Sequence, residues 1–257
     1  MKIALAQIDI VYEDIHSNFA TVEQFVVEAK QNESDFIIFP EMTCTGFSMN
    51  CHFIAHEHET LHFMKNLSKK FDIVICFGMV TCHNHHYYNR LMIVDGDEEI
   101  LSYDKIHPFH DEAKYYEKGD HIERCFIKQI PVSAFICYDL RFPEIFQYAS
   151  KNCDIIIVIA SWPVQRDEHW LTLLKARAIE NQCYIIGVNR VGQDEKECYI
   201  GHSVVYNSQG DMMTSLSSDE ENIYFEINRK DIKEARLGFC TKQDRREDFY
   251  LKLYQKK

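Results

Sequence analysis

The strongest constraint on the fold is the segment 154–160, which reads DIIIVIA and has no polar face. A strand that is apolar on both faces has to be covered on both sides, as in sheets flanked by helices. The neighbouring sequence agrees, because residues 167–182 have an amphipathic pattern of helical period and residues 184–189 return to a strand pattern. This alternation continues almost from end to end and predicts one α/β domain whose sheets are covered by helices.

The remaining elements follow from the same patterns. Strands are expected at 2–9, 35–39, 72–80, 131–136, 203–206 and 223–227, and helices at 18–30, from Pro143 onward, and at 231–237. Residues 87–94 and 99–103 predict a hairpin with a tight turn between them. Ser17 or Asn18 is expected to cap the first helix, since both residue types accept hydrogen bonds from free backbone N–H groups.

Residues 104–122 have no clear period and predict a long polar loop. Loops of this length inside compact domains usually have a function. The sequence has no linker, repeat or low-complexity stretch, so residues 1–257 are expected to form a single domain. Residues 240–257 are expected to be a polar C-terminal tail that could contact a neighbouring subunit.

Composition excludes several classes of function. With 28 basic and 40 acidic residues the net charge is −12, which argues against a nucleic-acid binder and against an anionic-membrane binder. The longest apolar run, 155–160, is far too short for a bilayer span, and the N-terminal segment reads as a strand rather than a signal peptide. The ten cysteines include no C-x-x-C pair, so reduced thiols in a cytoplasmic protein are expected.

Three residues that can perform chemistry follow predicted strands. Glu41 follows the strand DFIIF through a proline, Lys105 follows ILSY, and Cys137 follows PVSAFI. Ligand sites of α/β sheets gather where strands end. A carboxylate, an ammonium group and a thiol at three such ends favour a nucleophilic site, although the spacing alone is weak evidence because many strands end in polar residues.

The local sequences around these residues strengthen the hypothesis. They read FPEM with TGF (39–47), YDKIH (103–107), ICYDLRFPE (136–144), ASWP (160–163), ARAIENQ (176–182) and GVNRVG (187–192). Together and in this order they resemble the nitrilase superfamily of carbon–nitrogen hydrolases. The resemblance extends over nearly the whole chain, from Lys2 to about Tyr250.

The resemblance implies an α/β fold built as a four-layer α-β-β-α sandwich, with two mixed sheets facing each other and helices outside. It also implies that no metal or organic cofactor is required, and that the partners are a small amide substrate and water. Relatives usually dimerise or form larger assemblies, so a homodimer is expected.

At matching positions the resemblance implies catalytic roles. Cys137 would be the nucleophile, Glu41 the general base, and Lys105 the cation that stabilises the tetrahedral oxyanion, with help from the backbone N–H of Tyr138. A second glutamate of the family falls at Glu112. These roles agree with the chemistry, because an amide is a poor electrophile and its attack needs both a base and charge stabilisation.

Within the superfamily, the sequences MTCTGFSM and SWPVQRDEHW are similar to the omega-amidase branch. Enzymes of this type hydrolyse 2-oxoglutaramate or 2-oxosuccinamate, so the distal carboxylate needs a cation. Arg166 or Arg141 could supply it, although Arg141 could instead form a structural ion pair with Asp139. Trp162 is expected in the pocket wall. Hydrolases of carbamoyl or aliphatic amides are the alternative, and nitrile hydrolysis is a weaker one.

Some details depart from the family pattern. Pro108 replaces an apolar residue, Ser161 stands where the family usually has Asn, and residues 239–245 lack a common proline. Asp111 and Glu117 also compete with Glu112 for the role of second glutamate.

Histidines give a rival hypothesis from another functional class. His52 and His56, and then His58 and His62, are spaced i, i+4, and on a helix each pair could face a metal such as zinc. A second group lies at residues 82–86. The motif H-E-x-x-H is absent, however, so a polar surface helix and turn is the simpler interpretation.

Overall fold

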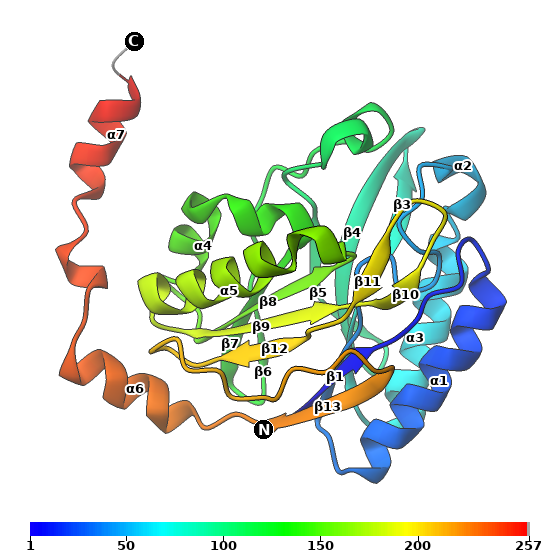
Figure 1. Cartoon of the computed structure of the whole chain (residues 1–257), viewed down its shortest axis with the longest axis horizontal. Helices are drawn as coiled ribbons and strands as arrows, with labels where there is room; N and C mark the ends of the chain where they lie inside the picture. The colour runs from blue at the N-terminus through cyan, green and yellow to red at the C-terminus, as the bar shows by residue number, and fades with distance from the viewer. Residues whose placement is uncertain (256–257) are drawn as a thin grey trace.

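Two sheets packed face to face form the centre of the protein, seen in a computed structural model that describes residues 1–255 (Figure 1). The first sheet has the order β13 (Glu221–Glu226), β1 (Lys2–Gln7), β2 (Phe36–Ile38), β3 (Val74–His83), β4 (His86–Asp95), β5 (Glu98–Asp104). The second has the order β12 (Val204–Tyr206), β9 (Tyr184–Asn189), β8 (Ile155–Ala160), β7 (Ile130–Ile136), β6 (Cys125–Ile127). A separate hairpin pairs β10 (Val191–Gln193) with β11 (Cys198–Ile200).

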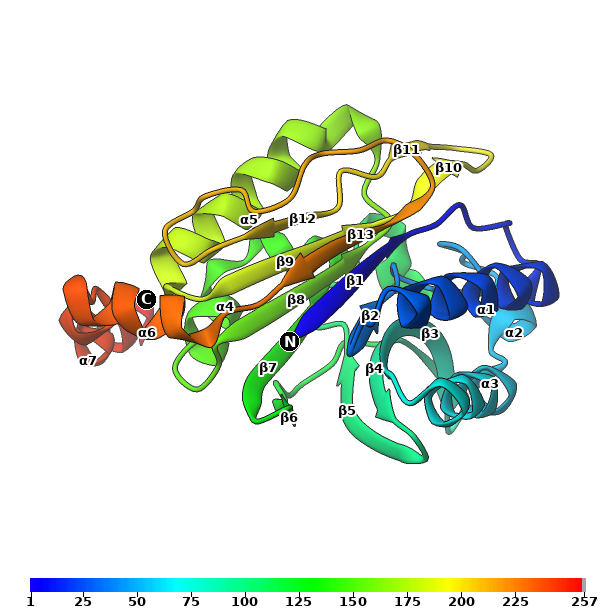
Figure 2. The ribbon, with the colours of Figure 1, turned by 90° about the horizontal axis from the view of Figure 1, so that it is seen from below.

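Helices cover the outer face of each sheet. Helices α1 (Ile15–Gln31) and α3 (Glu57–Phe71) lie on the first sheet, and α4 (Pro143–Ala149) and α5 (Asp167–Asn181) lie on the second (Figure 2). The expected α-β-β-α order of layers is therefore confirmed. The remaining helices are α2 (Cys51–Ile54), α6 (Arg229–Gly238), α7 (Glu247–Gln255) and the 3-10 turns η1 (His110–Lys114), η2 (Cys137–Arg141), η3 (Val164–Arg166) and η4 (Lys242–Asp244).

Strand β1 shows how the apolar pattern forms these layers. Ile3 and Leu5 belong to the core between the two sheets, whereas Ala4 and Ala6 belong to the core beneath α1 and α3. Successive side chains of a strand point to opposite faces, so a strand between two apolar layers has to be apolar throughout. All six residues of β8 are likewise buried, as its sequence predicts.

The parallel strands place their carboxyl ends at one edge of each sheet. Strands β1, β2 and β3 are parallel neighbours in the first sheet, and β7, β8 and β9 are parallel neighbours in the second. Because the sheets face each other, residues that follow β2 and β7 are brought together although about 100 positions separate them in the chain.

Three local expectations need correction. The first helix begins at Ile15, and its cap is Asp14, whose Oδ1 accepts from the N–H of Ser17 at 3.1 Å, rather than Ser17 or Asn18. The long loop contains the turn η1. The tail contains helix α7, which carries exposed apolar side chains and is therefore not simply polar. No helix within residues 1–255 is long and apolar enough to cross a membrane.

The contact between β9 and α5 gives a first prediction. A Cβ placed on Gly187 would lie 2.4 Å from Leu174 Cδ1 and 2.7 Å from Trp170 Cζ2, both in buried side chains. We expect Gly187→Ala to separate helix from strand and to lower the free energy of unfolding by about 1–3 kcal/mol, measured by chemical denaturation. Gly238→Ala is the control, since its Cβ would meet nothing within 4 Å. Equal stability of both variants would contradict the packing described.

Candidate active site

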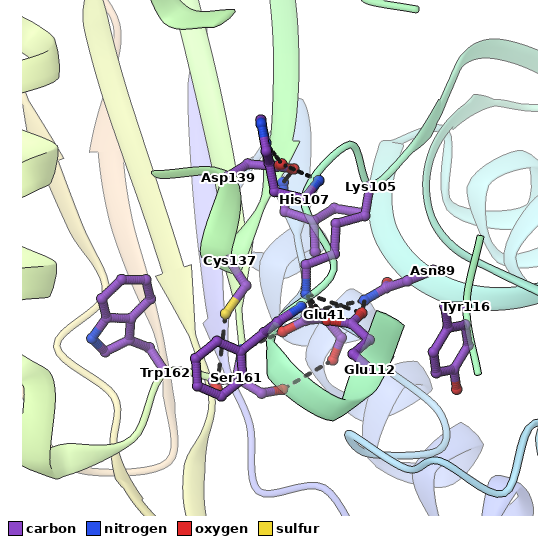
Figure 3. Close-up of polar contacts among 12 residues, drawn as sticks. Glu41, Asn89, Lys105, His107, Glu112, Tyr116, Cys137, Asp139, Ser161 and Trp162 are labelled. Carbon is purple, nitrogen blue, oxygen red and sulfur yellow. Dashed lines mark hydrogen bonds and ion pairs between the residues drawn. The ribbon is translucent and has the colours of Figure 1, made fainter. Parts of the chain in front are cut away.

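Four of the predicted catalytic residues meet between the two sheets (Figure 3). Glu41 follows β2, Lys105 follows β5, and Cys137 is the first residue after β7, while Glu112 comes from the turn η1 in the long loop. Glu41, Lys105 and Glu112 are at most 1% exposed, and Cys137 is partly exposed. The fold therefore brings together the four side chains that the sequence singled out.

A buried ion triad forms the floor of this site. Lys105 Nζ donates to Glu41 Oε1 at 2.8 Å and to Glu112 Oε2 at 2.8 Å. The competing residues of the loop lie elsewhere, because Asp111 pairs with Lys114 at 2.7 Å and Glu117 lies 2.8 Å from a histidine nitrogen of β4. Glu112 is thus the second glutamate of the triad.

Asn89 on β4 completes the triad and was not identified from the sequence. Its Nδ2 donates to Glu41 Oε1 at 2.8 Å and to Glu112 Oε1 at 2.9 Å, so one amide bridges both carboxylates. The amide is 1% exposed. The available signal was an amide side chain within a predicted strand. A polar side chain in such a segment is buried only when it has hydrogen-bond partners.

The backbone of Ser161 contacts both Glu41 and Cys137. Its N–H donates to Glu41 Oε2 at 2.9 Å, and its carbonyl oxygen lies 4.0 Å from Cys137 Sγ. Both contacts use main-chain atoms, so they do not depend on the side chain at this position.

Cys137 itself occupies a strained turn. Its φ is +46°, in the left-handed region that non-glycine residues rarely adopt. Asp139 holds the turn, since its carboxylate accepts from Tyr103 Oη at 2.8 Å and from the backbone N–H of Ile136 at 3.1 Å, and lies 2.8 Å from His107 Nδ1. The same carboxylate therefore connects the turn that carries Cys137 with the loop that follows Lys105.

The charges of the site shift three pKa values. Burial raises the pKa of the Cys137 thiol well above its ordinary value; the charge of Glu41 adds to this effect, and that of Lys105 opposes it. Burial also raises the pKa of Glu112, against the lowering effect of Lys105. For Lys105 burial favours the neutral form, but Glu112 and Glu41 outweigh it and raise the pKa. The resting site thus holds an ammonium ion and a protonated thiol.

A cavity of about 320 Å³ opens above Cys137. Its lining includes the four residues predicted to bind substrate, which are Tyr138, Arg141, Trp162 and Arg166. The ring of Tyr138 lies edge-on to that of Phe109, with 5.0 Å between centroids. Volume and lining suit a small organic molecule. Tyr115 and Tyr116 are not among the lining residues, and Tyr116 donates to Ser48 O at 2.6 Å.

The alternative role of Arg141 as an ion-pair partner of Asp139 is wrong. Its guanidinium lies over the Trp162 ring, 4.7 Å from the centroid, and within residues 1–255 it forms no ion pair with a carboxylate. Asp139 already has three other donors, so Arg141 is left facing the cavity.

The rival metal hypothesis finds no support in the described part of the chain. Residues 1–255 contain no group of three or more His, Cys, Asp or Glu side chains that could hold a metal ion. His52 lies in α2 and His56 precedes α3, so this pair does not share a helix, whereas His58 and His62 both lie in α3 at the expected i, i+4 spacing.

Comparison with known proteins agrees with this geometry. The family model described as carbon–nitrogen hydrolase matches residues 2–237. The chain belongs to the carbon–nitrogen hydrolase family. It is therefore an enzyme that hydrolyses carbon–nitrogen bonds, and the family predicted from the sequence motifs is confirmed.

The chain is similar to two amidases and to one protein of known structure. The chain is 31% identical to 2-oxoglutaramate amidase of Bacillus subtilis, covering 96% of this chain and 98% of the relative. It is 34% identical to omega-amidase YafV of Yersinia enterocolitica, covering 82% and 83%. The crystal structure of XC1258 from Xanthomonas campestris, a CN-hydrolase superfamily protein with an arsenic adduct in its active site, has a TM-score of 0.89 at 27% identity, covering 95% and 97%.

Alkylation of Cys137 tests the electrostatics of this carbon–nitrogen hydrolase site. Since the charge of Glu41 raises the thiol pKa, Glu41→Gln favours the thiolate and lowers that pKa. We expect the midpoint of the pH profile of iodoacetamide alkylation at Cys137 to move to lower pH, measured by peptide mass spectrometry. The exposed Cys198 is the internal control for the reagent. An unchanged midpoint would contradict the charge contribution of Glu41.

Proposed function

We propose that this carbon–nitrogen hydrolase is an amidase of the omega-amidase type, acting on small dicarboxylic acid monoamides such as 2-oxoglutaramate and 2-oxosuccinamate. The observation that carries the proposal is a cation without a carboxylate partner among residues 1–255, Arg141, in a cavity that ends at a thiol. An amide with a distal carboxylate complements both ends of such a cavity. The similarity to 2-oxoglutaramate amidase and omega-amidase YafV supports the same substrate class.

In the acylation step that we propose, Glu41 accepts the proton of Cys137 as Sγ attacks the amide carbon. The raised thiol pKa makes this base necessary, because little thiolate exists at neutral pH without it. Negative charge develops on the carbonyl oxygen, where Lys105 Nζ and the N–H of Tyr138 oppose it. Loss of one such donor typically costs about 2.7–4 kcal/mol of barrier. The proton held by Glu41 passes to the leaving nitrogen, so ammonia departs and a thioester remains.

In the deacylation step a water molecule attacks the thioester carbon. Glu41 takes a proton from this water, the oxyanion forms again beside Lys105, and the proton returns to Sγ as the acid leaves. Glu112 and Asn89 hold Lys105 and Glu41 in position through both steps, which supports a positioning role for them. This chemistry uses only protein groups and water.

Arg141 is the side chain that we propose for the distal carboxylate of the substrate. It lies across the face of Trp162, and Trp162 Nε1 donates to Arg166 O at 2.7 Å, so the aromatic wall holds both arginine-bearing segments in place. The aromatic lining also suits uncharged amides. Aliphatic-amide or carbamoyl hydrolysis therefore remains the second candidate.

Ammonia release distinguishes the candidates. We expect wild-type protein to release ammonia from 2-oxoglutaramate and 2-oxosuccinamate at least tenfold faster than from glutamine, an N-carbamoyl amino acid or an aliphatic amide. Cys137→Ala should abolish release and leave the melting temperature within a few degrees. Release only from the carbamoyl or aliphatic substrates would overturn the omega-amidase assignment, and activity in Cys137→Ala would overturn the thioester mechanism.

We further propose a cytoplasmic homodimer in which the segment from residue 240 onward contacts a second copy of the chain. Ten free cysteines, several of them buried, support a reducing compartment. Helix α7 stands away from the layered body in Figure 1, with Leu251 62% and Tyr254 76% exposed. Apolar side chains on an isolated helix are a typical interface feature. Within this proposal the rest of the chain forms one hydrolase domain.

Light scattering tests the homodimer. We expect wild-type protein to have twice the chain mass of 30.4 kDa. Leu253→Glu places a charge among the apolar side chains of α7 and should shift the mass toward the monomer, whereas Gln255→Glu adds the same charge at the helix end and should not. A monomeric wild-type protein, or equal behaviour of both variants, would contradict this interface.

A further inference from the structure

The two arginines of the cavity have different electrostatic surroundings. Arg141 has no carboxylate partner in residues 1–255, whereas Arg166 Nη2 lies 3.9 Å from Glu197 Oε1. Both side chains of this second pair are 33% exposed, so water screens them only in part. The cavity therefore contains one arginine whose charge is available and one whose charge is already opposed.

Glu197 belongs to the short turn between β10 and β11. Residues 194–197 of this turn all line the cavity. Asp194 is occupied within the turn, since it accepts from Tyr199 Oη at 2.7 Å and from the N–H groups of residues 196 and 197. Glu195 and Lys196 are exposed. Glu197 is thus the acidic side chain of the turn that faces a cavity arginine.

The position of Arg166 does not depend on this pair. Its carbonyl oxygen accepts from Trp162 Nε1 at 2.7 Å, its N–H donates to Pro163 O at 3.1 Å, and its guanidinium lies 5.5 Å from the centroid of the Phe109 ring. A separation of 3.9 Å is also longer than a charge-assisted hydrogen bond. Loss of the Glu197 charge would therefore free Arg166 while leaving it in the cavity.

We propose that Glu197 is a specificity-determining residue that limits the substrate to one carboxylate. By opposing the charge of Arg166 it leaves Arg141 to bind a single distal carboxylate. A substrate with a second carboxylate has to compete with Glu197 for Arg166 and is repelled by it. This inference rests on the proposed omega-amidase function, and it adds the discrimination between amides with one and with two carboxylates.

Binding without turnover tests the role of Glu197. In the Cys137→Ala background, calorimetry would compare succinamate, which has one carboxylate, with the monoamide of tricarballylic acid, which has two. We expect Glu197→Gln to strengthen binding of the dicarboxylate about tenfold relative to binding of succinamate, which corresponds to about 1.4 kcal/mol. Glu195→Gln is the matched control, because it removes the same charge from a side chain of the same turn that, within residues 1–255, forms no ion pair with Arg166, so the ratio should stay unchanged.

Arg166→Gln identifies the group through which Glu197 acts. In the Arg166→Gln background we expect Glu197→Gln to change the ratio of the affinities for the two amides less than twofold. Equal changes in Glu195→Gln and Glu197→Gln, a gain that persists without Arg166, or no binding of either amide would overturn the proposal. Failure of the proposed omega-amidase function would give a different result. Wild-type protein would then release no ammonia from 2-oxoglutaramate, whatever the affinities of the variants for the two amides.

Discussion

The structure depends on burying one ammonium ion between two carboxylates. Lys105, Glu41 and Glu112 are all withdrawn from water, and burial of such charges is unfavourable unless every partner is in place. Loss of one partner from a buried ion pair typically costs about 3–5 kcal/mol, because the other charge is left uncompensated. The first sheet, the hairpin of β4 and β5 and the long loop must therefore adopt their positions together. The geometry of the site and the stability of the fold share these contacts.

Close packing of β3 against the main chain at Glu41 also fixes the position of this carboxylate. A Cβ on Gly78 would lie 2.4 Å from Met42 N and 2.9 Å from Glu41 Cα, so β3 passes directly beside the segment that carries the carboxylate. Met42 has a φ of +46°, and Thr43 N donates to Gly78 O at 2.9 Å. Glu41 is thus held by its main chain as well as by its ion pair.

Sequence reasoning predicted the layers and the four side chains that meet between the sheets, because both depend on strong local patterns. Strand β8 has no polar face, and Cys137 lies within a long motif. It did not identify Asn89, whose partners are 48 and 23 positions away, because a hydrogen bond between distant residues leaves no local pattern. For the segment of helix α7 the sequence predicts a polar tail, because three of its nine residues are charged.

The hairpin of β10 and β11 forms a two-stranded sheet of its own, outside the ladders of the two large sheets. Its turn borders the cavity without sharing a hydrogen bond with the ion triad at the floor. Mutations in this turn can therefore accumulate, or be introduced by design, without disturbing the machinery that breaks the bond. Enzymes with this architecture can diversify in the molecules they accept while inheriting an unchanged reaction.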